Sequence, residues 1–323
     1  MQPHVVVAEP LGLQLLDLQR AVVADHHGCL HDTLPLRDMC VRLSRATVAG
    51  VELTVDGAVA TLTLDRPEVA NALDAASLDR LDECMARIEA DEDVVAVVLR
   101  AEGRHFCAGH DLKELLAGEE RWAARRSTPE GRLRHELARY WAPMVRLRDA
   151  RPITIAAVQG TCSAAGLMLA CMCDLIVAAD DARFSNPVAR MSGVGVELLV
   201  EPWEVGPRKA KELLLLAQTW DAPTAERLGL VNRVVPRDDL WAEARAMADD
   251  VALVPPLTAE AIKRSINGML DRMGQRDSWQ LHFWLHQFVS ATPTATARGE
   301  ARRAGGMAAV KAEQSGTPPP KLT

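Results

Sequence analysis

The chain contains no apolar run approaching the roughly 20 residues that a membrane-spanning helix requires. Its 323 residues are 48% hydrophobic and 25% charged, a balance that allows one sizeable core. Acidic residues outnumber basic ones, and the formal net charge of −7 gives no electrostatic reason to expect nucleic acid as a partner. A local basic patch would still suffice to bind phosphate groups. The composition therefore predicts a compact soluble protein without membrane or nucleic-acid partners.

The cysteines lack both an even count and the spacing of a metal site. There are seven, and no secretory signal precedes them, so we expect reduced thiols in a cytoplasmic chain. Cys171 and Cys173 lie on an expected helix, where their thiols face different directions. Residues 1–45 gather four further candidate ligands in a spacing that matches no common zinc pattern, namely His26, His27, Cys29 and His31. We therefore predict no metal site, and we expect residues 1–45 to form a poorly ordered or atypical extension.

Two turns rich in small residues, 105–112 and 159–166, are the most informative features that are present. Each follows a β-branched run, 94–99 or 153–158, which predicts a short buried strand. The turns are therefore expected at the carboxyl ends of strands, where open α/β sheets bind their ligands.

Backbone N–H groups of both turns can be aimed at one point. One donor would be the N–H of His110, and the other the N–H of Ala165 at the positive end of the following helix. The pattern predicts an oxyanion hole, which needs no particular side chain. Cys107 and Cys162 flank this site, but without an identifiable base we expect them to pack as small apolar residues rather than to act as nucleophiles.

Hydrophobic periodicity predicts a hairpin, an amphipathic helix and a helical C-terminal region. Strands at 51–55 and 59–64 are joined by an Asp-Gly turn, and a helix follows over 74–90. The remaining expected elements are a strand over 182–185, helices over 210–217 and 224–229, a strand over 231–236, and helices over 240–252, 256–270 and 277–290. We expect an extension at 1–45, a core at 46–236, the helical region at 237–310 and a disordered tail at 311–323.

The motifs together resemble the crotonase superfamily, the fold of enoyl-CoA hydratases and isomerases, over about Gly50 to Met307. Those that match in order and spacing are Asp65-Arg66-Pro67, Asn71-Ala72-Leu73, Phe106-Cys-Ala-Gly-His-Asp-Leu112, Ala164-Ala-Gly166 and Cys173-Asp174-Leu175-Ile176. The resemblance implies an α/β spiral of ββα units with a helical C-terminal trimerisation region. It also implies a homotrimer or homohexamer that binds an acyl-CoA thioester and uses no cofactor beyond the CoA of its substrate. His110 and Ala165 would then stabilise the thioester enolate.

The two glutamates that act as acid and base in the resembled hydratases are replaced here by other residue types. Two glutamates of that pattern fall on Met168 and Val188, and neither side chain can activate water or deliver a proton. The best substitute is Glu197, because Gly193 and Gly195 permit a sharp backbone path that turns it inward. The alternative is that Glu197 caps or begins the next helix and faces solvent.

Further substrate contacts follow from the resemblance, two of them with a structural alternative. Arg66 and Ala70 would border the CoA entrance, although Arg66 could equally tie down a turn. Lys263 and Arg264 would contact the CoA phosphates; the alternative is that both are ordinary surface charges. The turn residues Ala108, Asp111 and Leu112 would line the site with Met168 and Val188.

The charged segment 117–136 is expected to form a solvated helix or loop beside the acyl pocket. The hydrophobic residues that would line the acyl chain, or else simply belong to the core, are Trp122, Leu133, Leu137 and Trp141. His282 and His286 share one face of a helix, where packing is expected rather than metal binding. The His110 side chain could itself move protons near neutral pH.

Two functions remain open on the sequence. The first is an acyl-CoA enzyme of the hydratase/isomerase type with atypical acid–base residues, a lyase or an isomerase. The second is a non-catalytic protein on the same fold that binds acyl-CoA or a partner, because loss of both glutamates would permit it.

Overall fold

The computed structural model describes residues 50–117, 128–191 and 193–316. The expectations for residues 1–45, including the four candidate zinc ligands, and for Trp122 lie outside these ranges. None of the helices in the described ranges is long and apolar enough to cross a membrane.

The main sheet has six strands in the order β1-β2-β3-β4-β6-β9. β1 and β2 form the expected antiparallel hairpin, and every other neighbouring pair is parallel. A second sheet has the order β5-β7-β8. The strands are β1 (Gly50–Asp56), β2 (Val59–Asp65), β3 (Ala96–Ala101), β4 (Ile153–Val158), β5 (Thr161–Ser163), β6 (Leu175–Ala179), β7 (Arg183–Ser185), β8 (Thr219–Asp221) and β9 (Arg233–Val235).

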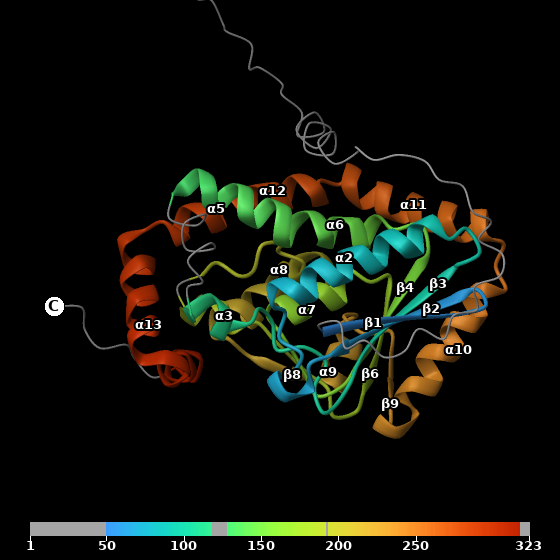
Figure 1. The fold of residues 1–323 in the computed structure, drawn as a ribbon, viewed down its shortest axis with the longest axis horizontal. Helices are drawn as coiled ribbons and strands as arrows, with labels where there is room; N and C mark the ends of the chain where they lie inside the picture. Colours follow the sequence, from blue (N-terminus) through green and yellow to red (C-terminus); the bar gives the residue numbers. More distant parts are fainter. Residues whose placement is uncertain (1–49, 118–127, 192, 317–323) are drawn as a thin grey trace, which may run out of the picture. The chain divides into compact units, whose positions relative to one another are not determined.

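The inner strands of the main sheet, β2, β3, β4 and β6, bury both faces, as parallel sheets do. In β3 the side chains alternate, so that Val97 and Leu99 pack into the larger core, which also contains residues of α2. Ala96 and Val98 face the other side, where they meet α10. Figure 1 shows α2 and α6 on one side of the sheet and α10 on the other. The sheet is thus a rigid layer whose carboxyl edge carries the turns.

The helices and helical turns largely follow the expected pattern. They are η2 (Pro67–Val69), α2 (Ala75–Ala90), α3 (Leu112–Ala117), α5 (Pro129–Glu136), the π-helical η3 (Leu137–Trp141), α6 (Ala142–Asp149), α7 (Ala165–Cys171), η4 (Pro187–Met191), α8 (Glu201–Leu216), α9 (Ala222–Arg227), η5 (Arg237–Asp239), α10 (Leu240–Ala252), α11 (Pro256–Arg272), α12 (Gln275–Ser290) and α13 (Pro293–Gln314).

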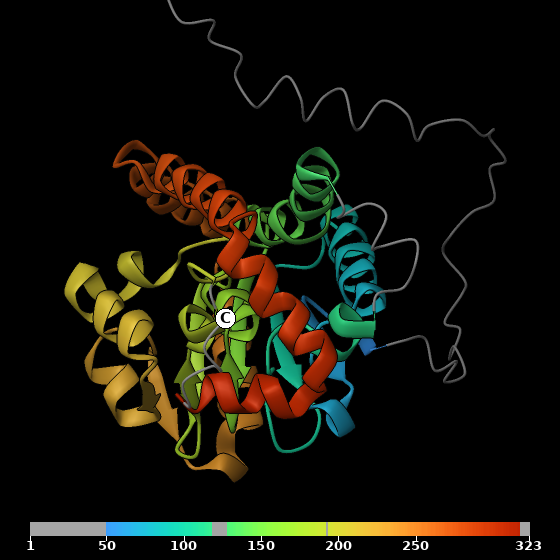
Figure 2. The ribbon, with the colours of Figure 1, turned by 90° about the vertical axis from the view of Figure 1, so that its left-hand side faces the viewer.

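The last helix was not predicted as a separate element. α13 bends at Gly306, where the backbone takes a positive φ of 57°, and it continues to Gln314, beyond the boundary expected at residue 310. It packs against α3 and η4. In Figure 2 the two arms of this helix cross the face of the molecule that is turned toward the viewer.

Candidate active site

The two small-residue turns meet at the carboxyl edge of the sheet. A parallel bridge pairs Cys107 with Cys162, with Ser163 N–H donating to the Cys107 carbonyl at 2.9 Å. The approach is so close that a Cβ added to Gly166 would lie 2.3 Å from the Cys107 carbonyl oxygen. Such contacts are essentially never made by real side chains, so the juxtaposition of the turns requires glycine there.

The two predicted donors, the N–H groups of His110 and Ala165, lie on these neighbouring turns. The Gly109 carbonyl and the Asp111 N–H both bond to Leu73, so the N–H of His110 between them faces away from Leu73. Ala165 is the first residue of α7, where an N–H has no acceptor within the helix.

Gly109 lies between the two donors. A Cβ added to it would be 3.3 Å from the Ala165 nitrogen, and Gly109 itself has a φ of 101°. Ala164, which precedes the second donor, also holds a positive φ of 51°, the kind of backbone strain that clusters at functional sites. That the two N–H groups bind one oxyanion stays a prediction.

Glu197 faces inward and is paired with His110. Its Oε2 lies 3.0 Å from His110 Nε2, and only 4% of Glu197 is exposed. Gly195, with a φ of 126°, makes the sharp path that the sequence suggested. The alternative that Glu197 begins the next helix and faces solvent is wrong, because α8 starts at Glu201.

The charge state of Glu197 is set by opposing influences. Burial raises its pKa, but the adjacent His110 lowers it through its charge and its hydrogen bond, and His286 lowers it further. Glu136 acts in the opposite direction as a like charge. The net result is a pKa below the ordinary glutamate value, which favours a carboxylate near neutral pH.

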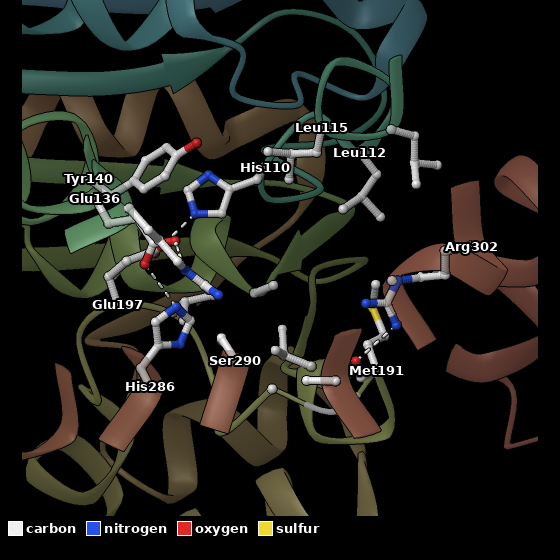
Figure 3. Close-up of a pocket in the computed structure, with 18 of the residues that line it drawn as sticks. His110, Leu112, Leu115, Glu136, Tyr140, Met191, Glu197, His286, Ser290 and Arg302 are labelled. Carbon is white, nitrogen blue, oxygen red and sulfur yellow. Dashed lines mark hydrogen bonds and ion pairs between the residues drawn. The ribbon is translucent and has the colours of Figure 1, made fainter. Parts of the chain in front are cut away.

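A cavity of about 880 Å³ opens beside this pair (Figure 3). Five of the predicted site residues line it, namely Ala108, His110, Leu112, Val188 and Glu197. The cavity is also lined by residues that were not expected there from the sequence, namely Leu115, Glu136, Tyr140, His286 and Arg302. The Tyr140 ring lies 4.3 Å from the His110 ring, centre to centre.

Residues 128–135 of the segment 117–136 are exposed or half-buried, as expected of a solvated helix, but Glu136 at the end of α5 is not solvated. It is 1% exposed and accepts hydrogen bonds from Arg132 at 2.9 Å and from Gln287, and it pairs with His286 at 3.2 Å. The spacing of Arg132 and Glu136, four residues apart on one helix, was the one signal available in sequence. Their partners on α12 lie about 150 residues away, beyond any local pattern.

Arg66 and Asp111 form ion pairs and hydrogen bonds that hold the turn at 105–112 in place. The Arg66 guanidinium pairs with Asp111 at 3.0 Å and with Asp74 at 3.1 Å, and it also donates to the Ala72 carbonyl. Asp111 additionally accepts from the N–H of Lys113 at the start of α3. The structural alternative therefore accounts for both side chains. Ala70 accepts from Ala108 N–H at 3.0 Å, and its contact with CoA stays a prediction.

Three other predicted contacts are corrected by burial. Met168 is 1% exposed within the core, and Trp141 packs edge-on against Phe283 with ring centres 5.2 Å apart, so neither lines the cavity. Lys263 is 6% exposed and pairs with Asp174 at 2.7 Å while donating to the Pro152 carbonyl. It is neither surface charge nor free to meet a phosphate. Its neighbour Arg264 is exposed and pairs with Glu260.

The described cysteines are buried or half-buried free thiols. Burial raises the pKa of the Cys107 thiol to about 12 and that of Cys162 well above its usual range, so neither is a thiolate near neutral pH. This agrees with the expectation that they pack rather than react.

Within the described ranges, one group of three side chains lies close enough together to hold a metal ion, namely Glu136, Glu197 and His286. Glu197 is hydrogen-bonded to the His110 imidazole, and Glu136 is paired with the His286 imidazole and with Arg132. His282, expected to pack, lies 2.7 Å from the Val196 carbonyl through Nε2. The imidazoles thus have protein partners, and the expectation of no metal stays a prediction.

The fold and the site define an α/β protein with a buried Glu197–His110 pair beside a cavity at the carboxyl edge of its sheet. Comparison with known proteins agrees with this class. A family model described as enoyl-CoA hydratase/isomerase matches residues 54–299. The chain is 40% identical over 249 residues to the putative enoyl-CoA hydratase EchA13 of Mycobacterium tuberculosis, covering 73% of this chain and 78% of that relative.

Two solved structures extend the comparison. A probable enoyl-CoA hydratase from Mycobacterium smegmatis is 42% identical, with a TM-score of 0.69, and the match covers 74% of this chain and 94% of that one. An enoyl-CoA hydratase/isomerase from Xanthobacter autotrophicus Py2 is 32% identical, with a TM-score of 0.77, and the match covers 84% and 100%. The chain belongs to the enoyl-CoA hydratase/isomerase family and has the crotonase fold, as its motifs predicted.

Proposed function

We propose that this protein transfers protons at the carbons next to the thioester carbonyl of an acyl-CoA. The observation that carries the proposal is the buried Glu197 carboxylate, hydrogen-bonded to His110 and lining the same cavity as the turn that supplies one N–H donor. The names of the similar proteins, which are enoyl-CoA hydratases, support a CoA thioester as the substrate class.

The reaction begins when the Glu197 carboxylate removes a proton from the acyl chain. The electron pair of that C–H bond moves into the conjugated system, and negative charge collects on the thioester oxygen. The N–H groups of His110 and Ala165 donate hydrogen bonds to this oxygen, which stabilises the enolate. Glu197 then returns its proton at another carbon, and the thioester carbonyl re-forms.

Double-bond migration is the reaction that this arrangement supports most directly. It needs only one group that picks up a proton and returns it elsewhere, whereas hydration needs a second group to activate water. Met168 and Val188, where the resembled hydratases carry glutamates, can do neither. We therefore propose an atypical member that acts as an isomerase first and as a hydratase weakly or not at all.

The test is incubation with short, long and aromatic 2- and 3-enoyl-CoAs, followed by absorbance of the conjugated thioester and by mass. We expect a change in bond position without a change in mass, and a fall of about 10²–10⁴-fold in turnover for Glu197→Gln, the usual range for a lost acid–base group. Glu201→Gln is the matched control, because Glu201 is also buried but does not line the cavity.

Two results would lead elsewhere. Gain of water with the same dependence on Glu197 would make the protein a hydratase with a relocated acid–base group. Tight binding of every thioester with no turnover by the wild-type protein would favour the non-catalytic binding function, which loss of both glutamates permits.

A further inference from the structure

A second buried ionic cluster lies directly behind Glu197. Glu136 at the end of α5 is joined to His286 of α12, while Arg132 and Gln287 occupy its remaining hydrogen-bonding positions. Glu136 is 1% exposed and His286 is 8% exposed. This set of four residues, the Glu136 cluster, therefore has protein partners in place of bulk water.

The cluster reaches Glu197 itself. A carboxylate oxygen of Glu136, one of Glu197 and a ring nitrogen of His286 all lie within 4.8 Å of one another. Figure 3 shows the three side chains converging from different parts of the chain, with His110 on the far side of Glu197. Two carboxylates and two imidazoles thus meet at one end of the cavity.

Such a cluster is a poor device for stability alone. Taking charged groups out of water costs several kcal/mol per ion, and apolar residues of similar size often serve as well or better. Two carboxylates in this proximity also disfavour each other's ionisation. The arrangement is better explained by an effect on the neighbouring proton-transfer group.

We propose that Glu136 and His286 are positioning residues that set the proton affinity of Glu197. The negative Glu136 favours the protonated form of Glu197, and a positive His286 favours the ionised form. Because the two act in opposite directions, each offsets part of the other's influence on Glu197. The pair thereby adjusts how readily the Glu197 carboxylate takes up a proton and returns it, which is what the proposed function requires; this inference rests on that function.

The groups around Glu197 come from three sides. His110 follows β3, Glu136 and Arg132 come from α5, and His286 and His282 come from α12. Burial raises the pKa of Glu197, His110 and His286 lower it, and Glu136 raises it. Glu136 and His286 therefore act in opposite directions, and their removal should have opposite consequences.

The experiment measures kcat/KM against pH on the best acyl-CoA of the panel, for wild type, Glu136→Gln and His286→Gln. The acid-side inflection reports ionisation of Glu197 in the free enzyme. Glu136→Gln removes a negative charge and should move the inflection to lower pH by about one unit; His286→Gln should move it to higher pH by a similar amount. The double variant should return close to the wild-type value, and Glu201→Gln should leave the inflection in place.

A merely structural role gives a different result. If the cluster only ties α5 to α12, both variants lower kcat/KM by a constant factor at every pH and the inflection stays where it is, which overturns the inference. Should Glu136→Gln fail to fold, Arg132→Gln provides the same test, since it leaves the charge of Glu136 less compensated and should move the inflection upward.

Failure of the proposed function is distinguishable from failure of this inference. If Glu197→Gln retains wild-type turnover, Glu197 is not the proton-transfer group and the inference is overturned along with that function. If Glu197→Gln loses turnover while the Glu136 and His286 variants leave the inflection unmoved, only the inference is overturned.

Discussion

At the residue scale, the site depends on positions where a side chain would not fit. Gly166 is the clearest, because a Cβ there would come within 2.3 Å of the Cys107 carbonyl oxygen. Glycine at this contact lets the two turns approach each other closely. Its contribution to the site therefore comes through the backbone that it shapes.

Gly166→Ala should accordingly separate the turns. We expect a loss of about 1–3 kcal/mol in the free energy of unfolding, the usual cost of overpacking a core, and a fall in turnover as the Ala165 N–H shifts. Denaturant unfolding and steady-state kinetics measure the two effects. Gly268→Ala in α11 is the control: the nearest atom to its added Cβ is an Arg272 side-chain nitrogen at 3.6 Å, so it should be neutral or slightly stabilising. Equal behaviour of the two variants would refute the steric argument.

Lys263 gives a second prediction at this scale. Lys263→Met strands Asp174 without its cation and should cost about 3 kcal/mol of stability, since breaking a buried pair typically costs about 3–5 kcal/mol. The affinity for CoA should not change, because the amine is committed within this chain. Calorimetric titration with CoA checks the second point, and a large loss of affinity in folded protein would restore the phosphate contact expected from sequence.

Residue roles could be predicted where they depend on local sequence. Glu197 follows two glycines, and the predicted N–H donors lie within small-residue turns, so the local sequence alone pointed to these residues. The Glu136 cluster was not, because it unites helices about 150 residues apart: Arg132 and Glu136 alone resemble surface charges, and His286 alone resembles a packing residue.

At the scale of elements, periodicity located most helices and strands, and it failed where tertiary packing decides. β4 and α10 agree with the predicted ranges, whereas α8 begins at Glu201, well before the expected residue 210. Its first turns contain proline and a glycine at 206 with non-helical geometry, which hide the helical pattern. The π-helical turn at Leu137–Trp141, beside Glu136, likewise has no sequence signal.

Glu201 at the start of α8 makes the free energy of unfolding depend on pH. Glu201 is 2% exposed and its Oε2 has no hydrogen-bond partner, and burial raises its pKa despite a bond from Asn186. The folded state therefore holds this proton more tightly than the unfolded state does. Stability that depends on Glu201 is complete below the unfolded pKa and is lost as the pH rises through the folded pKa.

Glu201→Gln should remove that dependence. We expect a Tm about 2–4 °C higher than wild type at pH 8, corresponding to about 1 kcal/mol, and a smaller difference at pH 4. Thermal unfolding at the two pH values tests this. A variant destabilised equally at both would show that the carboxylate is well accommodated.

At the scale of the whole molecule, α11 and α12 expose a broad apolar surface. On α12 the exposed residues follow helical spacing on the side opposite His282 and His286. The large apolar residues exposed on the two helices and at the end of α11 are Leu257, Ile262, Ile266, Met269, Met273, Leu281, Trp284, Leu285 and Phe288. Exposed apolar surfaces often mark interfaces, and the homotrimer or homohexamer that the family resemblance implies stays a prediction.

Light scattering after size exclusion tests the assembly. We expect three or six copies of the 35.2 kDa chain for wild type, and a lower mass for the double variant Ile266→Glu/Leu281→Glu, because burying two carboxylates in an interface is costly. Val55→Glu is the control, since Val55 is 49% exposed and lies on β1 rather than on α11 or α12. A monomeric wild-type protein would refute the prediction.

Proton transfer by Glu197 through a thioester enolate is tested most directly by deuterium exchange at the α-carbon of a saturated acyl-CoA in heavy water, followed by mass. This exchange detects enolate formation without knowledge of the natural substrate. We expect exchange in wild type, a loss of at least about 10²-fold in the exchange rate of Glu197→Gln, and unchanged acyl-CoA affinity in that variant. Equal exchange in both proteins, or firm binding without exchange in wild type, would contradict it.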